Sequence, residues 1–177
     1  MVWRRGEGNK TRTSRGGGRC DDGSGCDRGP DARLRGVSTT DQTRRRFTTP
    51  VRVRYADTDA TGTLHPATYL MYFEVARVES LRGLGVPVGE FATRGVAMPV
   101  IEAGVNVVRP ARIDDLLEVD VLLDRIGPAS FSFDYEVARD GLLLASGFTR
   151  MAVIEPETGR ALRLPDWVRE LLVAIAG

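Results

Sequence analysis

The stretch from residue 66 to residue 82, PATYLMYFEVARVESLR, constrains the fold more than any other part of the sequence. It has the signals of a helix of about 17 residues, because Pro66 stands where a missing N–H costs nothing and Gly83 and Gly85 follow its end. Its first half is apolar nearly all round, with Glu74 as its lone charge. A helix that is apolar on every side is buried on every side. The rest of the chain is therefore expected to wrap around it.

Five segments with the character of β-strands are available for this wrapping. The first, FTTPVRVRY, alternates Val51, Val53 and Tyr55 with arginines, which is typical of a half-buried strand. Four more follow the helix, separated by turn-forming residues such as Asp140-Gly141. These four lie at about 97–109, 117–126, 131–137 and 142–154. In the second and third, alternation places one set of apolar side chains on the same face: Leu117, Val119, Val121 and Leu123, and Phe131, Phe133, Tyr135 and Val137. The order predicts an α+β fold, with an antiparallel five-stranded sheet around one long central helix and a C-terminal helix over 165–175. A short helix over 88–95 is also expected.

The first 46 residues differ in composition from the rest of the chain. They hold nine glycines, 12 basic and six acidic side chains, and almost no apolar residues. Such a segment cannot bury enough apolar surface to offset the entropy of ordering it. We therefore expect a disordered basic extension over 1–46 and a folded domain over 47–177. The extension could be a nucleic-acid-binding or membrane-binding arm or a targeting peptide, but its scattered acids favour a segment without function.

Composition also excludes several classes of function for the folded part. With 13 basic and 18 acidic side chains, residues 47–177 are mildly acidic, which argues against a nucleic-acid partner. No apolar run is long enough to span a membrane, and the start lacks the apolar stretch of a signal peptide, so a cytoplasmic protein with no membrane partner is expected. Both cysteines, Cys20 and Cys26, lie in the extension. Cysteine nucleophiles are thereby excluded from the domain, and no metal site is expected.

The loop over 56–65, ADTDATGTLH, gathers the candidate chemistry directly ahead of the long helix. The first N–H groups of a helix lack partners and carry a partial positive charge, so they can hold the oxyanion that forms when a carbonyl is attacked. A carboxylate such as Asp57 or Asp59 can attack the carbonyl carbon or deprotonate a water that does so. Together with His65, this arrangement suits metal-free hydrolysis of an activated acyl group such as a thioester.

Each of these residues also has a purely structural explanation. Asp57 or Asp59 could form turns through their side chains, and His65 could be a neighbour of the helix cap or a buried ring. Glu74 could pair with Arg77, because the two lie three residues apart on the helix.

The segment RYADTDATGTLHPATYLMYFEVARVE resembles the opening of the 4-hydroxybenzoyl-CoA thioesterase family of hotdog-fold acyl-CoA thioesterases. That family opens with an aromatic residue, a D-x-D-x-x-G loop and a helix rich in tyrosine and phenylalanine. Here these are Tyr55, the loop 57–62, and a helix with Tyr69, Tyr72 and Phe73. Further on, RPARIDDLLEVDV is similar to the family's strand–turn–strand. The resemblance covers about 47–155 and implies the hotdog fold.

The resemblance implies that Asp59 is the catalytic carboxylate, as nucleophile or general base. It also places the thioester carbonyl at the backbone N–H groups that open the helix. Pro66 has no N–H, so either Ala67 or the ring of His65 would supply the donor. Substrate-binding residues are then expected at Gly62, Thr68, Tyr69, Tyr72 and Phe73. The acyl pocket is expected beside the helix, near these aromatic residues and Met71.

The implied substrate is a thioester of coenzyme A or of an acyl-carrier protein, with coenzyme A as part of the substrate and no separate cofactor. The family implies a homodimer or homotetramer, with active sites where subunits meet. Two alternatives remain. A hotdog enoyl-thioester hydratase or dehydratase is disfavoured, because Asp59 and His65 lie six apart without the Asn-Pro expected between them. A non-catalytic acyl-CoA-binding module is the other.

Overall fold

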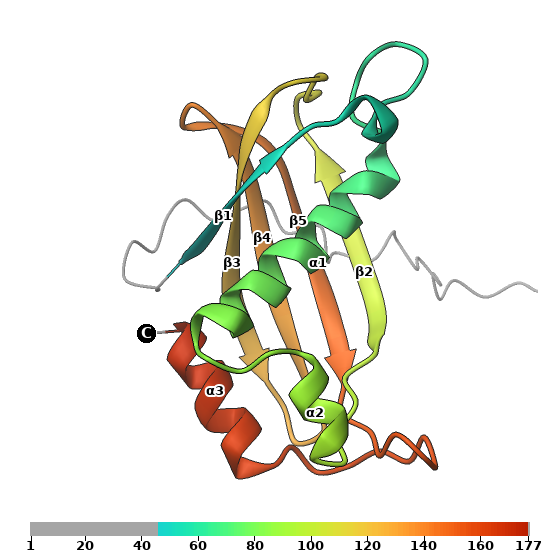
Figure 1. Ribbon diagram of the computed structural model, residues 1–177, viewed down its shortest axis with the longest axis vertical. Helices are drawn as coiled ribbons and strands as arrows, with labels where there is room; N and C mark the ends of the chain where they lie inside the picture. Colours follow the sequence, from blue (N-terminus) through green and yellow to red (C-terminus); the bar gives the residue numbers. More distant parts are fainter. Residues whose placement is uncertain (1–45, 177) are drawn as a thin grey trace, which may run out of the picture. The chain divides into compact units, whose positions relative to one another are not determined.

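Five antiparallel strands curve around helix α1 in the computed structural model, which describes residues 46–176 (Figure 1). The strand order across the sheet is β1-β3-β4-β5-β2. The elements are β1 (Phe47–Arg52), a 3-10 turn (Tyr55–Asp57), α1 (Pro66–Gly83), α2 (Gly89–Thr93), β2 (Val100–Val107), β3 (Leu116–Ile126), β4 (Ser130–Arg139), β5 (Leu142–Ala152) and α3 (Asp166–Ala176). The predicted α+β fold with a five-stranded sheet around one long helix is confirmed. The expected disorder of residues 1–45 lies outside the described part of the chain.

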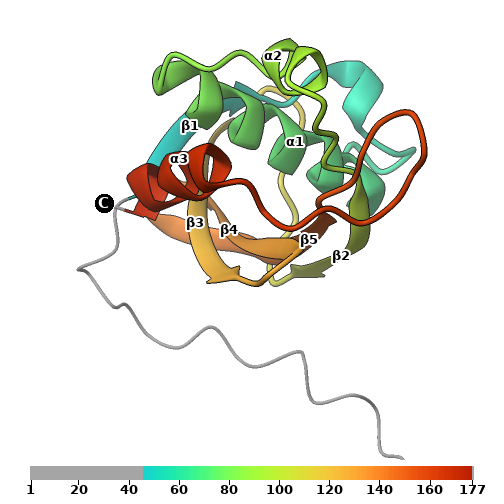
Figure 2. The same cartoon turned by 90° about the horizontal axis from the view of Figure 1, so that it is seen from below.

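The three helices lie on the same side of the sheet, which curls toward them (Figure 2). The inner face of the sheet is apolar because side chains alternate along each strand. The residues that β3 and β4 bury there are Leu117, Val119, Val121, Phe131, Phe133, Tyr135 and Val137. The sequence alternation predicted this set, and the register between β3 and β4 places Val121 beside Tyr135.

Helix α1 packs closely on the sheet through Phe73. Its ring stacks on Tyr135 with centroids 4.3 Å apart and an interplanar angle of 9°. The same ring lies over Gly147 on β5, where an added Cβ would come within 2.4 Å of the ring. A side chain at position 147 would push α1 away from the sheet, so this glycine sets the distance between the two layers.

One side of α1 is open in the single chain, so the expectation that it is buried on every side is wrong. Met71 is 57% exposed and Val75 43% exposed, and Glu74 is exposed between them. Among the described residues no ion pair joins Glu74 to Arg77. The Arg77 guanidinium instead lies close enough to the Tyr135 hydroxyl to influence its pKa, which burial raises. The apolar pattern of α1 therefore extends beyond the residues that its own sheet covers.

The first strand is shorter than expected. It ends at Arg52, and Val53 is still buried, but Tyr55 begins the 3-10 turn with 83% of its surface exposed. The expectation that Tyr55 lies on the buried side of a strand is therefore wrong. The chain turns here because the Arg54 backbone carbonyl accepts the N–H of Asp57 at 3.0 Å.

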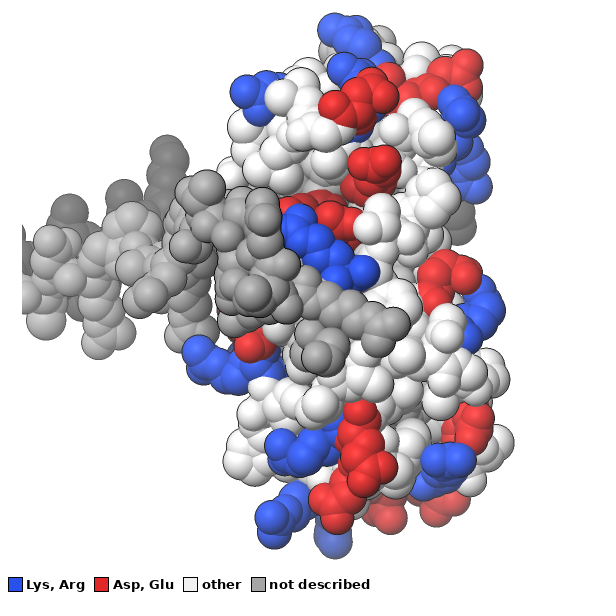
Figure 3. Space-filling model, turned by 90° about the vertical axis from the view of Figure 1, so that its left-hand side faces the viewer, with Lys and Arg blue, Asp and Glu red and all other residues white. Residues whose placement is uncertain are grey.

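The face of the molecule on the β1 side carries charged side chains of both signs, interspersed rather than separated (Figure 3). On the outer face of the sheet, Asp120 and Glu136 are direct cross-strand neighbours, an arrangement of like charges that destabilises a sheet. Arg46 offsets this repulsion, since one of its nitrogens lies 3.3 Å from Asp120 and 2.7 Å from Glu136. The described chain thus begins with a residue that is tied to the sheet.

Candidate active site

The loop between the 3-10 turn and α1 is closed on itself by backbone hydrogen bonds. The Asp59 N–H donates to the Thr63 carbonyl at 2.8 Å, and the Gly62 N–H donates to the Asp59 carbonyl at 3.0 Å. Gly62 has a φ of +73°, a conformation that suits glycine. At the neck of the loop, the His65 N–H donates to the Asp57 carbonyl at 3.0 Å. Asp59 is therefore the first residue of the turn that closes the loop, six positions ahead of the His65 N-cap of α1.

The Asp59 carboxylate is held by two threonines of its own loop. Its Oδ1 accepts the Thr61 N–H at 2.8 Å and the Thr61 hydroxyl at 2.6 Å, and the Thr63 N–H at 3.3 Å. The bond to the Thr61 N–H is the side-chain turn that the structural alternative predicted. These bonds, led by the Thr61 hydroxyl, lower the pKa of Asp59 to about 2. Among the described residues, its Oδ2 accepts only the Thr63 hydroxyl, at 3.1 Å. The residue as a whole is exposed.

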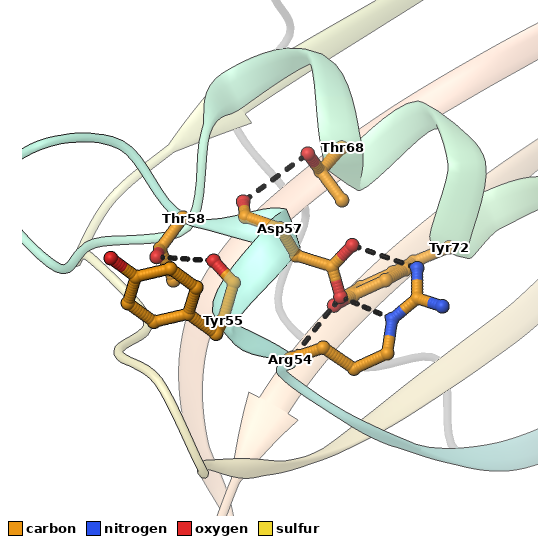
Figure 4. A network of polar contacts seen from close by, with 6 residues as sticks. All are labelled: Arg54, Tyr55, Asp57, Thr58, Thr68 and Tyr72. Carbon is orange, nitrogen blue, oxygen red and sulfur yellow. Dashed lines mark hydrogen bonds and ion pairs between the residues drawn. The ribbon is translucent and has the colours of Figure 1, made fainter.

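Asp57 is the opposite case, a buried carboxylate that is saturated with donors (Figure 4). Its Oδ1 accepts Arg54 Nη2 at 2.9 Å, and its Oδ2 accepts Arg54 Nε at 2.9 Å and the Tyr72 hydroxyl at 2.8 Å. The Arg54 side chain, ahead of the Tyr72 hydroxyl, lowers the pKa of Asp57 to about 2. Burial and the Asp57 carboxylate raise the pKa of Tyr72, so its phenol stays protonated and donates. Burial, together with donors on both oxygens, therefore keeps Asp57 from a reacting group in solvent.

His65 caps the N-terminus of α1 with its ring. Its Nδ1 accepts the Ala67 N–H at 3.2 Å, so in the neutral ring the proton must lie on Nε2. The Thr68 N–H is also occupied, because it donates to the His65 carbonyl at 2.9 Å. Pro66 has no N–H. The sequence offered two donors at the start of the helix, the Ala67 N–H and the ring of His65. The Ala67 N–H is occupied, so the ring Nε2–H of the exposed His65 is the donor that a substrate could use.

Four of the expected substrate-binding side chains lie inside the chain. Thr68, Tyr69, Tyr72 and Phe73 are buried: Thr68 reaches the Asp57 carbonyl at 3.4 Å, and the Tyr69 hydroxyl accepts the Ala111 N–H at 3.4 Å. Their contacts are those of packing and loop support.

The sequence analysis did not identify Arg54, Thr61 and Thr63, which hold the two carboxylates. Their spacing from Asp57 and Asp59, three, two and four residues, is the signal that could have found them.

An apolar cavity of about 270 Å³ lies farther along α1, between the three helices and the sheet. Its lining includes Val78, Phe91, Ala97, Met98, Phe133 and Met151. Glu74 and Arg77 line its α1 side. Because α1 rises about 1.5 Å per residue, Glu74 lies roughly 12 Å along the axis from Pro66. Ala67, Met71, Glu74 and Val78 share one stripe of the helix at this spacing, so the stripe connects the loop with the cavity.

Within residues 46–176, no group of His, Cys, Asp or Glu side chains is arranged to hold a metal ion. No helix in this part of the chain has the length and apolar character that crossing a membrane requires.

Comparisons with known proteins agree with the fold. The model of the thioesterase-like superfamily matches residues 53–172. A 1,4-dihydroxy-2-naphthoyl-CoA hydrolase of Nostoc punctiforme is 32% identical over 127 residues, which cover 71% of this chain and 86% of that protein. The acyl-CoA thioesterase YbgC of Haemophilus influenzae is 31% identical over 124 residues, which cover 70% and 91%.

Solved structures give the same result. The crystal structure of a hypothetical protein from Thermus thermophilus matches with a TM-score of 0.68 and 36% sequence identity, covering 75% of this chain and 98% of that one. The chain therefore belongs to the thioesterase-like superfamily of hotdog-fold proteins.

Proposed function

We propose that this protein hydrolyses acyl-CoA thioesters, with Asp59 as the nucleophile and the His65 ring as the donor to the thioester carbonyl. The observation that carries the proposal is the loop geometry. Thr61 and Thr63 fix the Asp59 carboxylate, and its Oδ2 accepts only the Thr63 hydroxyl among the described residues while the residue is exposed. The names of the relatives, an acyl-CoA thioesterase and an aromatic acyl-CoA hydrolase, support the same class of substrate.

The lowered pKa of Asp59, about 2, keeps its carboxylate ionised at neutral pH, which attack on a carbonyl requires. In the proposed reaction, Oδ2 attacks the carbonyl carbon, and the oxyanion accepts the Nε2–H of His65. The C–S bond then breaks, coenzyme A leaves as the thiolate and takes a proton from solvent, and an acyl–aspartyl anhydride remains. Water hydrolyses this anhydride to the free acid and the Asp59 carboxylate.

The apolar cavity is the proposed site for the far end of a long acyl group. An acyl chain that starts at the loop would follow the α1 stripe over Met71 to the cavity mouth at Glu74. Only a chain that spans roughly 12 Å along the helix reaches that mouth. A cavity of about 150 Å³ holds benzene, so 270 Å³ accommodates a larger apolar group.

Two expectations from the sequence stay predictions: that the protein also acts on carrier-protein thioesters, and that it is cytoplasmic.

The function is tested by free-thiol release from a panel of aliphatic and aromatic acyl-CoAs with the full chain. We expect release of one thiol and one carboxylic acid per ester, without added metal or cofactor. If the folded protein releases no thiol from any ester, the proposal fails. Loss of the conjugated double bond of a 2-enoyl-CoA would then indicate the hydratase alternative.

We also propose that the protein is a homo-oligomer whose subunits cover the open side of α1. Met71 and Val75 are exposed apolar residues there, and the edge strand β2 exposes Val100 and Ile101 beside its unpaired backbone groups. An apolar helix face and an unprotected strand edge are both surfaces that favour association.

Sedimentation of the Met71→Glu variant tests this surface. We expect the wild-type chain to sediment as a dimer or tetramer and the variant to shift toward the monomer, because a charge would have to be buried in an apolar contact. Val173→Glu, at an exposed position of α3, is the matched control and should keep the wild-type mass. An unchanged mass for Met71→Glu would place the subunit contact elsewhere.

A further inference from the structure

The structure assigns a positioning role to Asp57: together with Arg54 and Tyr72, it fixes the distance between Asp59 and His65. This inference rests on the proposed function, in which those two residues act on the same carbonyl. The cluster joins three parts of the chain, since Arg54 precedes the catalytic loop, Asp57 opens it, and Tyr72 belongs to the second turn of α1.

The Asp57 side chain ties the start of the loop to the helix. Its carboxylate is 5% exposed and accepts four hydrogen bonds, three from Arg54 and one from Tyr72. Bonds of this kind between a charged acceptor and fixed donors are among the stronger ones. The donors come from both sides of the loop, Arg54 before it and Tyr72 after it, so together they tie Asp57 to α1.

The Asp57 backbone ties the end of the loop to the same point. Its carbonyl accepts the His65 N–H at 3.0 Å and the Thr68 hydroxyl at 3.4 Å. Next to it, Thr58 and Leu64 form a β-bridge. Asp57 thus holds both ends of the loop. Asp59 lies two positions after it in the chain, and the backbone N–H of His65 donates to its carbonyl.

Asp57 acts through other residues rather than on the substrate. Both of its oxygens are occupied and the group is buried, so it offers nothing to a thioester. Loosening it would let Asp59 and His65 move relative to each other. Misplacement by about 1 Å is enough to cost roughly a hundredfold in rate, although binding of the coenzyme A portion would change little.

Steady-state kinetics of Asp57→Asn and Tyr72→Phe test the inference. We expect kcat for the best acyl-CoA to fall at least tenfold in Asp57→Asn and about threefold in Tyr72→Phe, with KM changed less than threefold in both. Tyr72→Phe removes one hydroxyl and keeps the packing of the ring, so it remains informative if Asp57→Asn folds poorly. Tyr135→Phe is the matched control: its buried hydroxyl bonds Thr149 at 2.9 Å, away from the loop, and kcat should stay within twofold of wild type. Equal kcat for folded Asp57→Asn and wild type would overturn the role.

Hydrogen exchange separates this inference from the proposed function. In Asp57→Asn, amides over residues 58–68 should exchange at least tenfold faster than in wild type, whereas those over 131–137 in β4 should not change. This readout needs no substrate. If wild type releases no thiol but the loop amides respond, the proposed function fails while the positioning contacts stand. If thiol is released and the loop amides do not respond, the positioning inference alone is overturned.

Discussion

Replacing Asp59 with asparagine is expected to lower kcat for acyl-CoA hydrolysis at least a hundredfold, a barrier increase of roughly 2.7 kcal/mol. Asparagine has the same shape, and its Oδ1 can still accept the Thr61 N–H and hydroxyl that hold the native side chain. The loop should therefore keep its conformation, while the anionic Oδ2 is replaced by an amide nitrogen that cannot attack a carbonyl. Thiol release at saturating substrate measures the loss.

Asp140→Asn is the matched control for the loss of one exposed carboxylate. Asp140 has a φ of +51° in the turn before Gly141, where asparagine is well tolerated, and the turn belongs to neither the loop nor the cavity. Its kcat should remain within twofold of wild type. A loss of less than tenfold in folded Asp59→Asn would exclude Asp59 as the nucleophile.

Turnover in ¹⁸O-water distinguishes the two roles of Asp59. Attack by Oδ2 followed by hydrolysis at the acyl carbon leaves Asp59 unlabelled, whereas water attack at the aspartyl carbon of the anhydride labels it. Label in a peptide containing Asp59 after many turnovers therefore demonstrates the anhydride. A general base leaves Asp59 unlabelled, because its carboxylate oxygens never bond to the acyl carbon.

The elements that sequence predicted well are those set by local periodicity. Strict alternation from Phe131 to Val137 gave the buried face of β4, and Asp140-Gly141 gave the turn that follows it. The length and ends of α1 followed from Pro66 and Gly83. Each of these features depends on neighbours within a few residues, which is the range over which a sequence pattern carries structural information.

The parts that sequence could not give depend on contacts between distant residues. The pattern placed Asp57 and Asp59 in one loop, but it could not show that Asp57 is buried and accepts a hydrogen bond from the Tyr72 hydroxyl, 15 positions away. The apolar character of α1 likewise did not reveal that Met71 is exposed in the folded chain. Amphipathic patterns report how much of a surface is buried, and they do not report what buries it.

The cavity beside α1 leads to the second large expected effect, a change in the acyl chain length that is accepted. Ala97 lines the cavity, and replacing it with leucine would fill part of the space. Each methylene that an apolar pocket cannot accommodate costs about 1–3 kcal/mol, or roughly 10–200-fold in kcat/KM. We therefore expect Ala97→Leu to lower kcat/KM for hexadecanoyl-CoA at least tenfold, while the value for butanoyl-CoA, which is too short to reach Glu74, stays within twofold.

The two esters test the position of the acyl chain as well as its size. Both react at the same carbonyl, so damage to Asp59 or His65 would lower the two values together, whereas a block in the cavity lowers only one. Ala161→Leu is the matched control, because Ala161 is exposed and lines a different hollow beside Arg163 and Arg169. It should leave the ratio of the kcat/KM values for the long and the short ester unchanged. If Ala97→Leu leaves the ratio at the wild-type value, the acyl chain does not enter this cavity. The stripe from Ala67 to Val78 would then serve the contact between subunits rather than the substrate.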